Sequence, residues 1–233
     1  MMKFIKYFVV LLWSTSAFAI SPKNYLKRIK QNYDQLKKYE LNLDYSLYKG
    51  YNGIEPLTTY NARYIKTPDK VYRKIQETEF IHFDNITLQI NHAEKICVLS
   101  DYQTTEFLEF DLAATLKRCK SVSVSDSPQG YRIKLELKAD ENTIPINRIE
   151  LLIDKNFWVK ETTIFYSTMA NFGTYFEKEM DFPKLKISYS KLKEKTNALD
   201  NVSLDQFLIE SSKKVLLTDR YLDYRLIDSR KRN

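Results

Sequence analysis

Residues 39–48 read YELNLDYSLY, and apolar side chains occupy every second position of this stretch. Leu41, Leu43, Tyr45 and Leu47 alternate with polar residues. Alternation with a period of two is typical of a β-strand that has one apolar face and one face in water. The stretch 131–137, YRIKLEL, shows the same pattern. These two segments predict an antiparallel sheet with one consistently apolar face.

Turn residues divide the remaining chain into further strands. Gly50 and Gly53 precede a strand expected at 57–66, and Pro68 ends it. Further strands are expected at 71–81, 86–91, 96–101, 121–125, 131–137, 147–153, 158–166, 185–192 and 215–228. The aromatic-rich segment 172–182 is ambiguous, and 200–213 fits a short helix or a loop.

Two segments carry the spacing of an amphipathic helix. In 23–38, apolar residues recur at i, i+3, i+7 and i+10, beginning with Leu26. In 104–119, Leu108, Leu112 and Leu116 lie four apart, with Phe107 beside them. A sheet with one apolar face must curl or be covered, and these helices are suitable covers. The predicted fold class is therefore α+β, a strongly curved antiparallel half-barrel with helices at its mouth.

The first nineteen residues have the features of an export signal. Lys3 and Lys6 precede the apolar run 7–13, and the small residues Ala17 and Ala19 suit signal peptidase. Cleavage after Ala19 would leave 233 − 19 = 214 residues with a net charge of +7 − 2 = +5. An uncleaved anchor is the alternative, but the apolar run is short for one. We expect a periplasmic protein in which residues 20–233 form one domain, since neither a linker nor a repeat divides them.

The two cysteines admit two interpretations. An even cysteine count in an exported chain favours a disulfide, and a Cys97–Cys119 bridge would close a loop of about twenty residues. Cys97 also lies in an apolar run, where a free thiol packs as a small hydrophobic group. Both alternatives remain open from the sequence.

Composition and motifs exclude most familiar catalytic sites. Four glycines cannot build the phosphate-binding loops GxGxxG or GxxxxGK[ST], and GxSxG, HExxH and CxxC are absent. The histidine–carboxylate pairs are His82 with Asp84 and His92 with Glu94, which we interpret as solvent-exposed turn residues. We therefore expect no enzyme activity, no metal and no cofactor. Export and the modest charge argue against nucleic-acid binding.

Aromatic residues are abundant, with 17 Tyr and 13 Phe. They could line a pocket for lipid tails, or they could fill the interior of the sheet completely. The candidate cavity residues are Leu41, Leu43, Tyr45, Leu47, Tyr60, Tyr64, Phe107, Leu108, Leu112, Leu116, Ile133, Leu135, Ile149 and Leu151.

Three stretches resemble a known superfamily. YIKTPDKVY at 64–72, FDNITLQI at 83–90, and IELLIDK at 149–155 followed by VKE at 159–161 are similar to the LolA/LolB-like periplasmic lipoprotein carriers and the related RseB-type sensors. The resemblance covers nearly all of the mature chain. It implies a curved sheet of about ten or eleven strands, covered by two or three helices, that holds acyl chains or another apolar ligand.

The resemblance also places a lid-latch region at Lys66, Thr67, Pro68 and Val71. In the lipoprotein carriers an arginine precedes the turn proline and an aromatic residue follows the turn. Here Thr67 and Val71 stand at those positions, and the nearby Lys66 lacks the planar fork of arginine.

We therefore expect a non-enzymatic periplasmic carrier for a lipid or a lipidated protein. The alternatives are an envelope sensor or scaffold that binds a partner protein of the inner or outer membrane, and a structural protein with a filled interior.

Overall fold

A computed structural model of the chain describes residues 21–101, 112–138, 145–174, 176–210 and 214–230. Helix α1 (Pro22–Gln35) begins with a proline, whose fixed φ suits the first turn of a helix. Leu26, Ile29 and Tyr33 form its buried stripe, as their spacing predicts. The helix ends at Gln35 because Leu36 adopts an extended conformation, with φ −78° and ψ 109°. Helix α2 (Leu112–Arg118) falls within the predicted 104–119, of which 104–111 lie outside the described residues.

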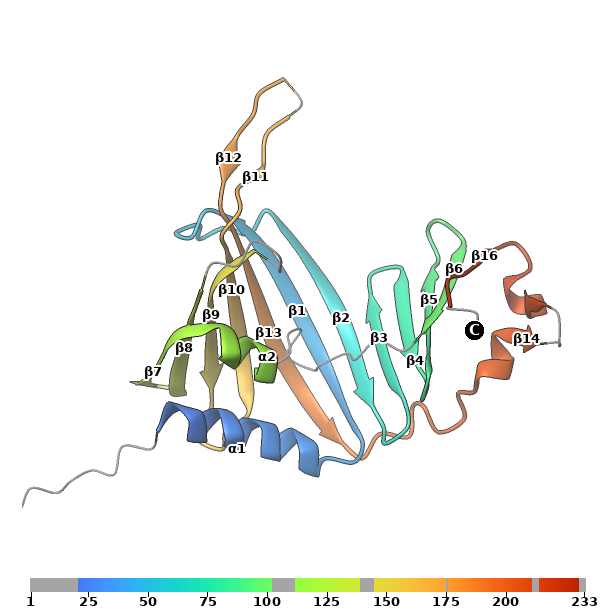
Figure 1. The fold of residues 1–233 in the computed structure, drawn as a ribbon, viewed down its shortest axis with the longest axis horizontal. Helices are drawn as coiled ribbons and strands as arrows, with labels where there is room; N and C mark the ends of the chain where they lie inside the picture. The colour runs from blue at the N-terminus through green and yellow to red at the C-terminus, as the bar shows by residue number, and fades with distance from the viewer. Residues whose placement is uncertain (1–20, 102–111, 139–144, 175, 211–213, 231–233) are drawn as a thin grey trace, which may run out of the picture.

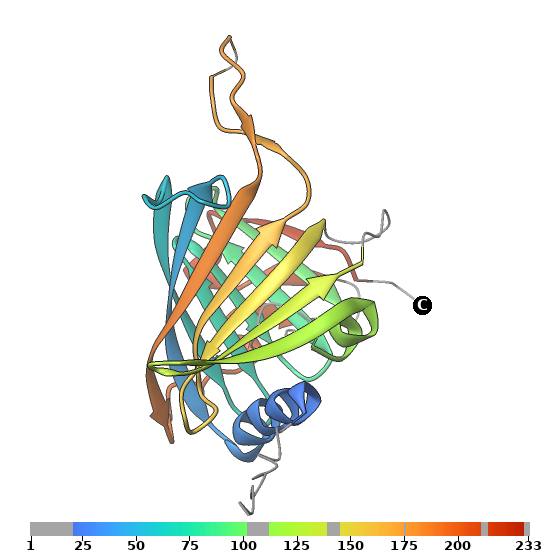
Figure 2. The same ribbon diagram turned by 90° about the vertical axis from the view of Figure 1, so that its left-hand side faces the viewer.

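One large sheet dominates the described residues. Its order is β16-β6-β5-β4-β3-β2-β1-β13-β10-β9-β8-β7, and it curves strongly toward α1 and α2 (Figures 1 and 2). The strands are β1 (Tyr39–Lys49), β2 (Thr58–Lys66), β3 (Val71–Ile75), β4 (Thr78–His82), β5 (Ile86–Asn91), β6 (Ile96–Asp101), β7 (Cys119–Ser127), β8 (Gly130–Leu137), β9 (Ile146–Ile153), β10 (Val159–Tyr166), β13 (Pro183–Glu194) and β16 (Arg225–Asp228).

A curved sheet with few helices is confirmed, but two details of the prediction are wrong. Twelve strands, not ten or eleven, form the sheet in the described residues. The sheet is mixed, because β16 pairs in parallel with β6 while the other neighbours are antiparallel. Arg225 pairs with Ile96 across a sequence separation of 225 − 96 = 129 residues, so no local sequence pattern marks this pairing.

Three segments differ from their predicted structure, and a fourth, 172–182, is ambiguous from the sequence. The single strand expected at 71–81 is the hairpin β3–β4, which turns at Gln76 with a positive φ of 49°. The ambiguous segment 172–182 ends in β12 (Met180–Asp181), which pairs with β11 (Ala170–Asn171). The strand expected at 215–228 divides into β15 (Val215–Leu217), a 3₁₀ turn and β16, while β14 (Leu208–Glu210) falls within 200–213 and pairs with β15.

Buried apolar residues form two clusters on opposite faces of the sheet. Leu41 and Tyr64 are cross-strand neighbours on the concave face, in the cluster that contains the α1 stripe. Glu40 and Ile65 are the next pair and face the opposite, convex side. The convex cluster continues from Tyr72 through β4, β5 and β6. The segment 199–228, which we call the C-terminal strap, covers it with Phe207, Leu208 and Tyr221.

Candidate functional site

The concave face carries rows of apolar side chains that cross six strands. The pairing register sets each row, because directly opposed residues share a face. One row is buried except at its last member, which is half-buried, and it consists of Ile133, Leu151, Thr162, Ile187, Tyr45 and Tyr60. The next row consists of Leu135, Ile149, Ile164, Leu185, Leu47 and Thr58.

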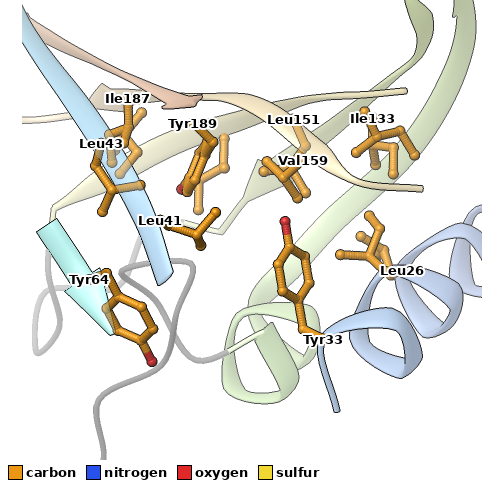
Figure 3. Packing of buried hydrophobic residues seen from close by; sticks show 14 of the residues in the cluster. Leu26, Tyr33, Leu41, Leu43, Tyr64, Ile133, Leu151, Val159, Ile187 and Tyr189 are labelled. Atoms are coloured by element: carbon orange, nitrogen blue, oxygen red, sulfur yellow. The ribbon is translucent and has the colours of Figure 1, made fainter. Parts of the chain in front are cut away.

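Helix α1 covers one end of this face. Leu26 and Tyr33 point toward Ile133, Leu151 and Val159 in Figure 3. The ring of Tyr33 lies 5.0 Å from that of Trp158 and 5.9 Å from that of Tyr39, measured between centroids. Asn32 Nδ2 also donates a hydrogen bond to the carbonyl of Asn156, at 2.7 Å. The helix is therefore fixed to the β9–β10 turn as well as to the apolar floor.

Tyrosines give the apolar face a small number of hydroxyl groups. The rings of Tyr45 and Tyr60 stack with centroids 4.8 Å apart and planes at 10°. Burial raises the pKa values of Tyr33 and Tyr39 well above the ordinary value, so both hydroxyls are neutral at physiological pH. The face therefore combines aliphatic and aromatic surface with uncharged hydroxyls, a lining suited to acyl chains.

The structure brings most candidate cavity residues together on this face. Eight are buried in the concave cluster, and Tyr60 and Leu116 are half-buried against it. Leu47 is half-buried on the same face. Phe107 and Leu108 lie outside the described residues, as does the side chain of Leu112. Whether the eleven placed residues contact a ligand stays a prediction.

Beyond β2 the concave face carries charged and polar side chains among its apolar ones. Tyr64 is paired directly with Arg73, and Arg73 with Phe80, over whose ring its guanidinium carbon lies at 4.9 Å. His82 is only 3% exposed, and its Nδ1 lies 2.8 Å from Thr87 Oγ1. The interpretation of His82 as an exposed turn residue is therefore wrong. His82 is the last residue of β4. In the sequence, only its position directly after the apolar pair Phe80 and Ile81 indicates that it belongs to a strand.

Burial lowers the pKa of His82 to about 4, and the positive charge of Arg73 adds to this effect. The imidazole is therefore neutral at physiological pH. His92, the other histidine, is half-buried rather than exposed. Its Nδ1 lies 2.8 Å from the Tyr224 hydroxyl, and its Nε2 lies 3.2 Å from Glu79 Oε1. It thus joins the β5–β6 turn to the C-terminal strap.

The predicted latch region forms a compact turn. Thr67 is buried, and its Oγ1 donates to Asp69 Oδ1 at 2.9 Å while accepting from the backbone nitrogen of Lys70 at 3.1 Å. The hydrogen bond from Thr67 lowers the pKa of Asp69. Lys70 Nζ lies 3.4 Å from the carbonyl of Leu199, at the start of the strap. The hydrogen bonds of the Thr67 hydroxyl thus lie within the turn.

Both cysteines are free thiols. Cys97 lies in β6 and Cys119 in β7, near opposite ends of the strand order. Burial raises the pKa of Cys97 to about 11, and it raises that of Cys119 as well. The structure therefore agrees with the interpretation that Cys97 and Cys119 are free thiols, and not with the disulfide.

A separate groove of about 370 Å³ lies on the convex face. Asn61 Nδ2 donates to Asp44, and Arg63 Nε donates to Glu40 Oε1 at 2.8 Å. The lining residues are Asn42, Asp44, Asn61, Ala62, Arg63, Lys74, Gln76 and Ser190. This lining suits polar groups rather than acyl chains, so the groove is chemically distinct from the concave face.

The described residues contain no group of three or more His, Cys, Asp or Glu placed to hold a metal ion. Within the same ranges, no helix has the length and apolar character needed to cross a membrane.

Comparisons with solved structures give distant similarities, among them the following two. No family model matches the sequence, and no curated protein matches it. An uncharacterized conserved protein from Thermus thermophilus is 13% identical with a TM-score of 0.45, over 80% of this chain and 96% of its own. A DUF1329 family protein from Desulfovibrio piger is 10% identical with a TM-score of 0.38, over 77% of this chain and 94% of its own. At scores and identities this low, neither similarity assigns a family or a function.

Proposed function

We propose that the chain is a non-enzymatic, exported carrier that binds a lipid or the acyl chains of a lipidated protein on its concave face. The observation that carries the proposal is the largely apolar floor across β8, β9, β10, β13, β1 and β2, in which the buried Thr162 is the polar member of the central row. The export signal and the sequence resemblance to lipoprotein carriers support a periplasmic location, with cleavage after Ala19. The signal itself lies outside the described residues.

The physical basis of binding is removal of hydrocarbon from water. Each buried methylene contributes about 0.8 kcal/mol, so a chain of about a dozen methylenes gives useful affinity without directed polar contacts. The helices α1 and α2 lie on the concave side of the sheet (Figure 2). A ligand would be held between this floor and its helical covers, and release requires those covers to separate from the floor.

The uneven cover of the floor also supports the proposal. The α1 stripe contacts the part of the face near Ile133 and Val159 (Figure 3). Tyr60 and Leu47, on the β1–β2 side, are only half-buried. The half-buried side is where an acyl chain would gain the most contact.

The test is binding of a fluorescent fatty-acid probe to the delipidated mature protein. Leu47→Gln places a polar amide on the floor at a half-buried position that tolerates it. Ser46→Gln makes the matched change on the convex face, one residue away. We expect probe binding to the parent, a several-fold loss in Leu47→Gln and no change in Ser46→Gln, with thermal melts confirming that all three proteins fold. Absence of probe binding to the parent, together with absence of co-purified lipid by mass spectrometry, would overturn the proposal.

A further inference from the structure

A two-stranded hairpin projects from the body of the protein at the end of the sheet away from α1 (Figures 1 and 2). It is built on the pairing of Ala170 with Asp181 and of Asn171 with Met180. Asn171 Oδ1 accepts hydrogen bonds from the backbone nitrogens of Gly173 at 3.0 Å and Glu179 at 2.9 Å. The projecting ribbon is therefore held in shape by its own hydrogen bonds.

The hairpin exposes large apolar side chains. Phe176 is 91% exposed, Met180 is 51% exposed, and Met169 at its base is 49% exposed. A projecting ribbon is surrounded by water, so polar residues are the ordinary choice there. Apolar residues gathered on such a segment mark an interaction surface.

A second segment adds apolar residues at the same end of the sheet. The connection between β1 and β2 exposes Ile54 at 89% and Leu57 at 54%. It meets the base of the hairpin, because Lys49 forms an ion pair with Glu179 and the Asp181 carboxylate lies against Gly50. We call Ile54, Leu57, Met169, Phe176 and Met180 together the apolar end.

We propose that the apolar end docks on the surface of a lipid bilayer, with Phe176 entering the interfacial layer. An exposed phenylalanine gains free energy when it leaves water for the boundary between the head groups and the acyl chains. A fluid bilayer also adapts to a narrow projection without needing a complementary shape.

The size of the hairpin tip argues against a protein partner. A stable protein interface buries about 800 Å² on each side, whereas one fully buried aromatic side chain supplies about 200 Å². Phe176 is the one exposed large apolar side chain described beyond the β11–β12 pairing, and it falls well short of that area. The charges of the second half of the hairpin alternate in sequence, with Lys178 between Glu177 and Glu179. This alternation suits zwitterionic head groups, which carry both signs, better than a strongly anionic surface.

Docking by the apolar end does not depend on whether the concave face holds a ligand, and the test keeps the two apart. Phe176→Trp places a fluorescent reporter on the hairpin. Leu222→Trp is the matched control, because Leu222 is 73% exposed but lies in the C-terminal strap. Each mature variant is mixed with phosphatidylcholine vesicles that carry bromine on their acyl chains, and the signal of the parent protein, which retains Trp158, is subtracted.

We expect the brominated vesicles to quench the reporter of Phe176→Trp at least several-fold more than the reporter of Leu222→Trp. Phe176→Ser combined with Met180→Ser should reduce co-sedimentation with unlabelled vesicles several-fold. Both side chains are exposed, so folding is retained. Equal quenching of the two reporters, or no quenching of either, would overturn the proposal. Binding restricted to anionic vesicles and abolished by salt would overturn it as well, since that behaviour indicates electrostatic attraction to another surface.

Discussion

The hydroxyl oxygens of Thr162 and Tyr189 lie 3.0 Å apart on the concave face, one on β10 and the other on β13. Thr162 is fully buried and Tyr189 nearly so. A buried hydroxyl must be hydrogen-bonded to avoid a desolvation penalty, and this contact meets that need within an apolar floor. It joins two neighbouring strands by their side chains as well as by their backbones.

Removing either hydroxyl should lower stability. We expect Thr162→Val and Tyr189→Phe each to reduce the free energy of unfolding by about 1 kcal/mol, and the two losses to be non-additive in the double variant. Urea denaturation of the four proteins measures both effects. Thr59→Val, at an exposed position of β2, is the control and should change stability little. Fully additive losses would show that the two hydroxyls do not interact.

The packing of α1 predicts a large effect of truncating its stripe. Leu26 is 1% exposed, so Leu26→Ala should reduce the free energy of unfolding by about 2–5 kcal/mol. Lys27→Ala, on the exposed side of the same helix, should have almost no effect. Thermal or urea melts compare the two variants. Equal, small effects would mean that the helix is not packed on the floor.

The buried His82 predicts a loss of stability in acid. Its pKa is 6.5 in the unfolded reference and about 4 in the folded protein, so the unfolded chain binds the proton first as the pH falls. The stabilisation by neutral His82 is present above about pH 6.5 and is lost progressively toward pH 4, by up to about 3 kcal/mol. Urea midpoints should therefore fall more steeply between about pH 7 and pH 5 in the parent than in His82→Gln. Parallel pH profiles would contradict the assignment.

The strap predicts what C-terminal truncation exposes. A chain that ends at Ala198 loses Phe207 and Tyr221, leaving Ile81, Leu88 and Leu99 facing water. We expect increased binding of a dye that reports exposed apolar surface, together with self-association seen by light scattering. Leu222→Ser in the full chain removes an already exposed apolar residue and should cause neither change. If the truncated chain stays as soluble as the parent and binds no more dye, the strap is not needed to cover these apolar residues.

The two free thiols predict a simple chemical result. Burial keeps Cys97 protonated, so an aromatic disulfide reagent should react slowly with the native protein and rapidly with both thiols after unfolding. The mass of the intact protein should be the same with and without reductant. A mass lower by two hydrogens in the absence of reductant would show a Cys97–Cys119 disulfide, which the structure does not contain.

Sequence patterns predict the regular elements well. Strand β1 and helix α1 follow strict periods of two and 3.6 residues because each has one buried face and one in water. The hairpin at Gln76 is not predictable in this way, because neither Gly nor Pro marks it. The presence of a buried cluster on each face of the sheet is not predictable in this way either. Tyr64 and Ile65 are adjacent and both buried, and a run of apolar residues does not show which face each one occupies.

In the candidate site, too, some features follow from the sequence period and others do not. Alternation in β1, β8 and β9 places their apolar residues on one face, because that face follows directly from the period. The buried environment of His82 depends on the curvature of the sheet as a whole, although the neighbouring strands β3 and β5 directly flank β4 in the chain. Sequence spacing holds no information on that curvature, so a buried and an exposed histidine look alike.

The position of the strap has a consequence for biosynthesis. Strands β3 to β6 are complete once the ribosome has passed residue 101, but the residues that shield their outer surface are translated much later, from residue 199 onward. The outer apolar surface of these strands therefore stays uncovered during most of elongation, and it can be buried only after the final segment has been synthesised.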